Sequence, residues 1–119
     1  MTKQRMAEVY RFLSVASMKR MTDDEKIAMI RQLREMKPTY TEMQDAVNDA
    51  MEKAKADKTD PKEIADLVNK AVADIATQPA DKDIRTMSAD TFQRLCLSND
   101  WNYAQIDELE AELVKEEQE

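Results

Sequence analysis

The side chains that could do chemistry in this sequence are mainly carboxylates, because Asp and Glu number 25 while His is absent and Cys occurs once. Pairs of carboxylates can act as general acid and base, or they can bind a divalent cation. The candidates are the adjacent pairs Asp23/Asp24 and Asp107/Glu108 and the Glu-rich tail at residues 116–119. The first pair has the sequence of a helix start and the second that of a solvated helix face. Neither pair therefore predicts catalysis or metal binding.

The absence of Gly and His excludes several further kinds of site. Phosphate-binding loops and dinucleotide fingerprints need Gly where a side chain would clash with phosphate. Catalytic triads and imidazole metal sites need His. The single thiol, Cys96, cannot form a zinc site or a redox pair, and beside Leu95 and Leu97 it is expected to be a small buried hydrophobe rather than a reactive group. We expect no enzymatic activity, no cofactor and no metal.

The composition predicts an all-α protein of one domain, residues 1–119. Charged residues reach 36% and Gly is absent, as expected for helices with solvated faces that are joined by short connections. No apolar stretch approaches the ~20 residues of a membrane span, and the N-terminus lacks the pattern of a secretory signal. We therefore expect a cytoplasmic location and no membrane contact.

Apolar spacing and stop signals predict a compact bundle of five to six short amphipathic helices. Pro38 is expected to end the second helix, and the third and fourth helices are expected to form a central antiparallel hairpin. The last two helices are expected to form a C-terminal pair. The single domain could then divide into a four-helix part, residues 1–78, and this pair, residues 84–119. The expected helices cover about residues 3–20, 23–37, 41–57 and 61–77, a short segment after Ser88, and a segment after Asn102.

Helix starts are the most specific local signals. Thr22 with Glu25 and Asn102 with Gln105 match the capping box, and the segment Thr39–Glu42 has the same form. Asp60 before Pro61 combines an acidic cap with proline at the first helical position. In the second expected helix the buried stripe is Met29, Ile30, Leu33 and Met36.

Charge divides the chain into regions of opposite sign. Residues 1–40 hold nine basic and five acidic residues, whereas residues 84–119 hold three basic and nine acidic ones. Such asymmetry is typical of an interaction surface, although solvated helix faces explain it equally well. The sequence predicts two partner-binding surfaces. The basic and apolar N-terminal surface comprises Val15, Met18, Arg20, Arg31 and Arg34, and the acidic last helix carries Asp107, Glu108, Glu110, Glu112 and Glu116.

These features favour a non-enzymatic protein–protein interaction module, such as an adaptor, inhibitor or assembly factor, with a protein partner that has a basic surface. The acidic helix could compete with nucleic acid by presenting carboxylates in place of phosphates. The alternative is a nucleic-acid-binding regulator that uses the basic N-terminal third. Self-association of the two oppositely charged regions is a third route. The small size and charge-rich helices would suit a phage or mobile-element accessory protein.

Overall fold

The computed structural model of the protein describes residues 1–114, and this part of the chain is all-α, as the composition predicts. None of the helices in this part is long and apolar enough to cross a membrane. Their bounds are α1 Lys3–Ser14, α2 Asp23–Asp57, α3 Pro61–Ala76, α4 Ala89–Leu97 and α5 Tyr103–Leu113.

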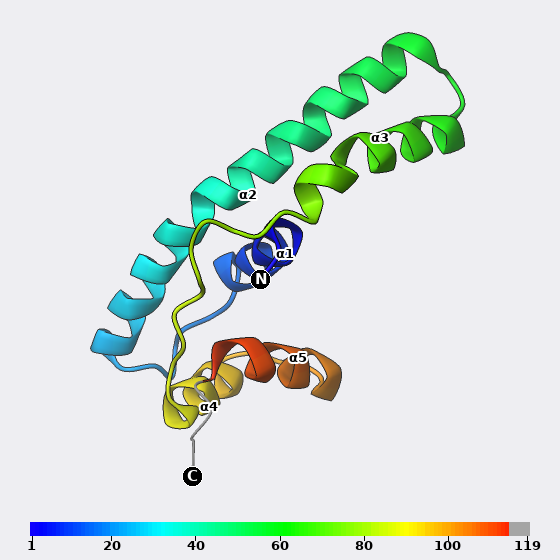
Figure 1. Ribbon diagram of the computed structural model, residues 1–119. Coiled ribbons are helices and arrows are strands. Elements are labelled where there is room, and N and C mark those ends of the chain that lie inside the picture. The colour runs from blue at the N-terminus through cyan, green and yellow to red at the C-terminus, as the bar shows by residue number, and fades with distance from the viewer. Residues whose placement is uncertain (115–119) are drawn as a thin grey trace.

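The largest departure from expectation is α2, which runs unbroken through Pro38 (Figure 1). We predicted that Pro38 would end one helix and that Thr39–Glu42 would begin another, and both predictions are wrong. Proline lacks the N–H that would bond the carbonyl of Arg34, which costs about 3 kcal/mol in a helix interior. Met36 and Met43, on either side of the proline, are nevertheless both buried. Burial of this continuous face outweighs the local cost, so one 35-residue helix replaces the two short ones.

The first helix is shorter than predicted, because α1 ends at Ser14 rather than near residue 20. The residues that follow are held by the end of α4 instead. The Asn99 side chain accepts a hydrogen bond from the Ser17 N–H at 2.8 Å and donates one to the Ser17 carbonyl at 2.9 Å. The Ser98 hydroxyl accepts from the Arg20 N–H at 2.9 Å. These bonds satisfy backbone groups that a longer α1 would have paired internally.

The other predicted helix starts are confirmed. Thr22 with Glu25 and Asn102 with Gln105 form complete capping boxes at the starts of α2 and α5. The Asp60 side chain accepts from the Lys62 N–H at the start of α3. Caps of this kind are each worth about 1 kcal/mol, and they depend only on residues within one turn of the helix end.

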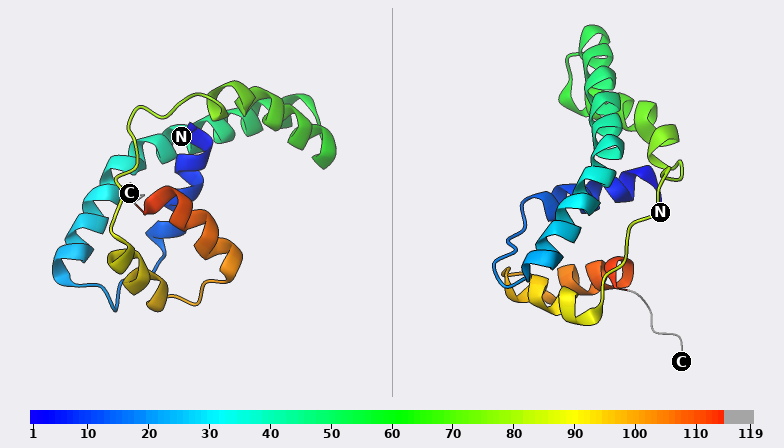
Figure 2. Two further views of the ribbon diagram at one scale, coloured as in Figure 1. Left: turned by 60° about the horizontal axis from the view of Figure 1, so that its bottom comes forward. Right: turned by 90° about the vertical axis from the view of Figure 1, so that its left-hand side faces the viewer.

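The helices form two parts of different construction (Figures 1 and 2). We call residues 43–76 the arm, which contains the C-terminal part of α2 and the antiparallel helix α3. The remaining described residues form the head, in which α1 lies beside α2, α4 lies at the start of α2, and α5 lies on the other side of α1 (Figure 2). The arm projects from the head and makes the described molecule elongated, with extents of 52 × 27 × 25 Å.

The main apolar core lies in the head. All ten of its buried members come from head residues, and Leu95 and Leu113 are fully inaccessible to solvent. The residues are Met6, Val9, Leu13, Met21, Met29, Met36, Phe92, Leu95, Leu109 and Leu113. Ile30, which we predicted to lie on the buried stripe of the second helix, is 41% exposed instead. Gln32 is buried on the inner face in its place and donates to the Arg85 carbonyl at 3.0 Å.

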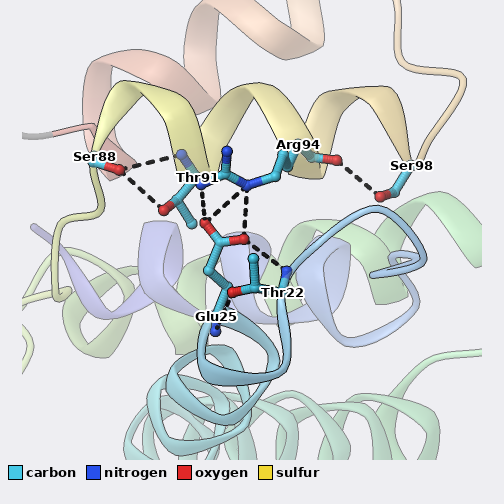
Figure 3. A network of polar contacts seen from close by, with 6 residues as sticks. All are labelled: Thr22, Glu25, Ser88, Thr91, Arg94 and Ser98. Atoms are coloured by element: carbon cyan, nitrogen blue, oxygen red, sulfur yellow. Dashed lines mark hydrogen bonds and ion pairs between the residues drawn. The ribbon is translucent and has the colours of Figure 1, made fainter.

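An ion pair fastens α4 to the start of α2 (Figure 3). The Arg94 guanidinium donates to both carboxylate oxygens of Glu25, with Nη2 at 2.6 Å from Oε2 and Nε at 2.8 Å from Oε1. The same Oε1 accepts the Thr22 N–H of the capping box at 2.8 Å. The Arg94 hydrogen bonds hold the pKa of Glu25 well below its usual range, against the opposing effect of burial. Glu25 is therefore both a helix cap and the anchor for α4.

Candidate partner-binding surface

The acidic last helix does not form one surface. In α5, Glu108 and Glu112 lie toward α1, where both pair with Arg5. Asp107 and Glu110 are exposed and make no ion pair within residues 1–114, and Glu110 lies near Cys96 beside α4. Glu116 lies outside the described residues. The helix period explains this division, because acids at positions 107, 108, 110 and 112 point in different directions at 100° per residue.

Arg5 is the centre of the charged group between α1 and α5. Its Nε lies 2.5 Å from Glu112 Oε1, and its two Nη atoms lie 3.3 Å from Glu8 and 3.9 Å from Glu108. Partial burial lowers the pKa of Arg5, but its hydrogen bond with Glu112 and the nearby charges raise it more, so the guanidinium stays cationic. One positive charge therefore faces three carboxylates, which leaves this group with a net charge of −2 at neutral pH.

One of these carboxylates is incompletely satisfied. Glu112 Oε1 accepts from Arg5, whereas Glu112 Oε2 is buried and has no hydrogen-bond partner among the described residues. A buried oxygen without a donor carries a desolvation cost. Glu112 was expected to lie on a solvated partner-binding face, and this expectation is corrected, because its side chain is only 23% exposed.

A groove lies between α1 and α5 beside this charged group, with a volume of about 240 Å³. Its floor is apolar, because Val9 and Leu109 are core residues and Phe12 packs against the core. Glu8 from α1 and Glu108 from α5 line its two sides together with Arg5, which contacts both, and the two glutamate side chains are 53% and 70% exposed. We call this feature the acid-walled groove.

Three large apolar side chains are exposed near the end of α1 and on the two sides of the α4–α5 turn, and we call them the corner patch. Val15, Leu97 and Tyr103 are 84%, 60% and 81% exposed, the three highest values among large apolar residues of the described chain. The bonds between Ser17 and Asn99 bring the end of α1 beside the α4–α5 turn, which Leu97 and Tyr103 flank.

An aromatic contact joins the corner patch to the acid-walled groove. The rings of Phe12 and Trp101 pack with centroids 5.0 Å apart at an interplanar angle of 44°. Phe12 lines the groove and lies three residues before Val15, and Trp101 lies two residues before Tyr103. Residues three apart on a helix are neighbours on one face. Groove and patch are thus adjacent on the surface formed by α1, α5 and the α4–α5 turn.

The other residues that we predicted for the N-terminal surface do not lie on the same face as Val15. Met18 packs against the core, so its expected role as a surface residue is corrected. Arg20 is exposed in the segment after α1, and Arg31 and Arg34 are exposed on the outer face of α2. On that face they lie near Ile27 and Ile30, which are 49% and 41% exposed. This second apolar and basic surface belongs to α2 alone.

Sequence reasoning missed Arg5 and Arg94, the two arginines that organise the head. Neither has a local signal, because their partners Glu112 and Glu25 lie 107 and 69 residues away in the chain. Cys96, expected to be buried, is half-buried beside a small cavity between α4 and α5, and burial raises the pKa of its thiol. Within residues 1–114 no three acidic or thiol side chains lie close enough together to hold a metal ion.

Comparison of the chain with protein-family models, curated proteins and solved structures finds no match. The site is therefore interpreted from its own residues and geometry.

Proposed function

We propose that this protein is a non-enzymatic protein–protein interaction module that docks a partner on the surface formed by the corner patch and the acid-walled groove. The observation that carries the proposal is the high exposure of Val15, Leu97 and Tyr103 on two segments that the bonds between Ser17 and Asn99 hold together. Exposed apolar side chains are common singly, whereas several of them in one region with a polar rim are typical of a binding surface. In such surfaces a few residues supply most of the binding free energy, and tyrosine is prominent among them.

The surface also has the anatomy of a protein interface. Apolar residues lie at its centre, and charged residues of both signs surround them, with Arg11 on α1 and Asp100 in the α4–α5 turn exposed nearby. Interfaces are apolar at the core and polar at the rim. The surface is held by α1, α5 and the hydrogen-bonded α4–α5 turn. Little ordering entropy would be lost on binding to a surface already held in place.

The alternative, nucleic-acid binding by the basic N-terminal third, has weaker support. Lys3 is in an ion pair with Glu42 at 2.8 Å, and Arg5 is surrounded by carboxylates. Cations neutralised within the chain release fewer counterions from a phosphate backbone, so they contribute less to affinity. The other exposed arginines of residues 1–40 lie on different elements, with Arg11 on α1, Arg20 in the segment after α1, and Arg31 and Arg34 on α2.

Affinity purification of the tagged full chain from its native host tests the proposal. The double variant Val15→Ser/Tyr103→Ser removes two anchors of the corner patch, and we expect it to lose the protein that the unaltered chain captures. The matched control is Leu67→Ser, which changes an exposed apolar residue of the arm and should leave capture intact. Equal capture by the double variant and the unaltered chain would refute the proposal.

A shift assay with generic DNA and RNA at low salt tests the alternative. Tight binding that is lost in Arg31→Glu/Arg34→Glu would favour a nucleic-acid-binding role over the protein-binding one. We expect no binding at moderate salt, because the chain carries a net charge of −7.

A further inference from the structure

We propose that the acid-walled groove receives a lysine or arginine side chain from an amphipathic helical segment of the partner, whose apolar residues then cover the corner patch. This inference rests on the proposed function and adds to it the chemical class of the partner segment. The evidence comes from the charge of the groove, the nature of its floor, and its position relative to the patch.

The groove has an excess of carboxylates over cations. Its charged lining consists of Glu8, Glu108 and Arg5, so two carboxylates share one guanidinium. Arg5 is bound most closely by Glu112, so its contacts with Glu8 and Glu108, at 3.3 and 3.9 Å, are long. Both glutamates therefore keep acceptor capacity for a second cation. An incoming phosphate or carboxylate would instead meet charge of its own sign.

The floor of the groove suits the stem of a long cationic side chain. Lys and Arg pack their methylene chains on apolar surface while the charged end remains in water. Val9, Phe12 and Leu109 provide that surface, and the acidic walls stand at the solvent edge. The Phe12 ring, supported by Trp101, is also a surface on which a cation is attracted to the aromatic face. An uncharged apolar side chain would fill the floor but would not neutralise the excess negative charge of Glu8 and Glu108 over Arg5.

The position of the groove on α1 predicts a spacing within the partner. Glu8 and Val15 lie seven residues apart on or directly after α1, which corresponds to two helical turns or about 10 Å. A partner helix lying along α1 and α5 would place a basic residue in the groove and an apolar residue on the corner patch at the same separation. The predicted motif is Lys or Arg followed or preceded, about seven residues away, by a large apolar residue.

Fluorescence titration of the full chain with synthetic helical peptides tests this inference, because the single tryptophan, Trp101, lies between groove and patch. The probe peptide carries one Arg and one Leu about two helical turns apart on an otherwise neutral, polar helix. A second peptide has Glu in place of Arg, and a third has Ser in place of Leu. We expect a saturable change in Trp101 emission with the first peptide, and affinities at least about tenfold lower with the other two.

Matched variants locate the binding. Glu8→Gln/Glu108→Gln removes both wall charges and should weaken binding of the Arg peptide by about tenfold or more. The control Glu63→Gln/Asp66→Asn removes the same charge from exposed positions on α3 and should bind as the unaltered chain does. Circular dichroism checks that both variants keep their helices.

Three outcomes would overturn the inference: equal binding of the Arg and Glu peptides, unchanged binding by the groove variant, or equal losses in the groove and arm variants. If the Arg peptide fails while the Val15→Ser/Tyr103→Ser variant still loses its natural partner, the proposed function stands and only the chemistry inferred for the groove is refuted.

Discussion

The head and the arm are built from similar helices, yet they bury their apolar residues to very different extents. In the head, four helical segments surround one core, and side chains such as Leu95 and Leu113 lose all contact with solvent. In the arm, α3 packs against α2 with little further cover, and Ala76 is the single residue of α3 that is buried. Five large apolar residues of α3 (Ile64, Leu67, Val68, Val72 and Ile75) remain partly or mainly exposed.

The difference shows that amphipathicity alone does not produce a core. The apolar stripe of α3 is at least as well formed as those of the head helices, but one neighbouring helix can cover only one side of it. Ala50 and Ala54 let α2 and α3 approach closely, which stabilises the pair without large buried side chains. Several helical segments packed around one core therefore give the head a dense interior. The arm, which has only two packed helices, buries few large side chains.

The strongest test of this contrast compares truncations of one leucine in each part. Leu95→Ala in the head should lower the free energy of unfolding by about 2–5 kcal/mol, because it opens a cavity in a closed core. Leu67→Ala in the arm, where the side chain is 38% exposed, should lower it by less than about 1 kcal/mol. Urea unfolding followed by circular dichroism measures both. Equal losses would show that the arm is packed as tightly as the head.

A second test concerns the ion pair that holds the head together. Glu25→Gln keeps the capping box but removes the charge that Arg94 binds, and should lower Tm by about 5 °C at pH 7. Because the pKa of Glu25 is lowered in the folded state, its contribution is complete above the ordinary value of 4.5 and declines as the pH falls below it. The difference in Tm between the unaltered chain and Glu25→Gln should therefore become smaller as the pH is lowered from 5 to about 2. A gap that stays constant with pH would contradict this role.

Pro38, on α2 close to the boundary between head and arm, provides a third test. Pro38→Ala restores an N–H that can bond the Arg34 carbonyl, and should raise the free energy of unfolding by about 1–2 kcal/mol, which is less than the full helix-interior cost because α2 already accommodates the ring. Hydrogen exchange of amides near this position should slow. A destabilised variant would indicate that the proline ring makes packing contacts that outweigh its missing donor.

The smallest expected effect is confined to the arm. Asp60→Ala removes the cap of α3 and should cost about 0.5–1 kcal/mol. If the arm opens separately from the head, native-state hydrogen exchange will speed up in α3 and remain unchanged in α4 and α5. Faster exchange throughout the chain would instead mean that head and arm unfold as one unit.

The sequence by itself determined the all-α class and the helix starts at Thr22, Asp60, Ser88 and Asn102. These features depend on residues within four positions of one another, so local pattern is sufficient to predict them. Val15 was named from the sequence as a partner-binding candidate, and its exposure of 84% comes from the structure.

Only the tertiary structure decided how those helices combine. Three outcomes depended on neighbours far away in the chain. They are the continuation of α2 through Pro38, the exposure of Ile30, and the choice of α5 acids that pair with Arg5. The physical reason is that local propensities differ by a few kcal/mol at most, and burial against distant segments contributes energies of the same size. Local sequence patterns do not specify which distant segments pack together, so they cannot predict this burial.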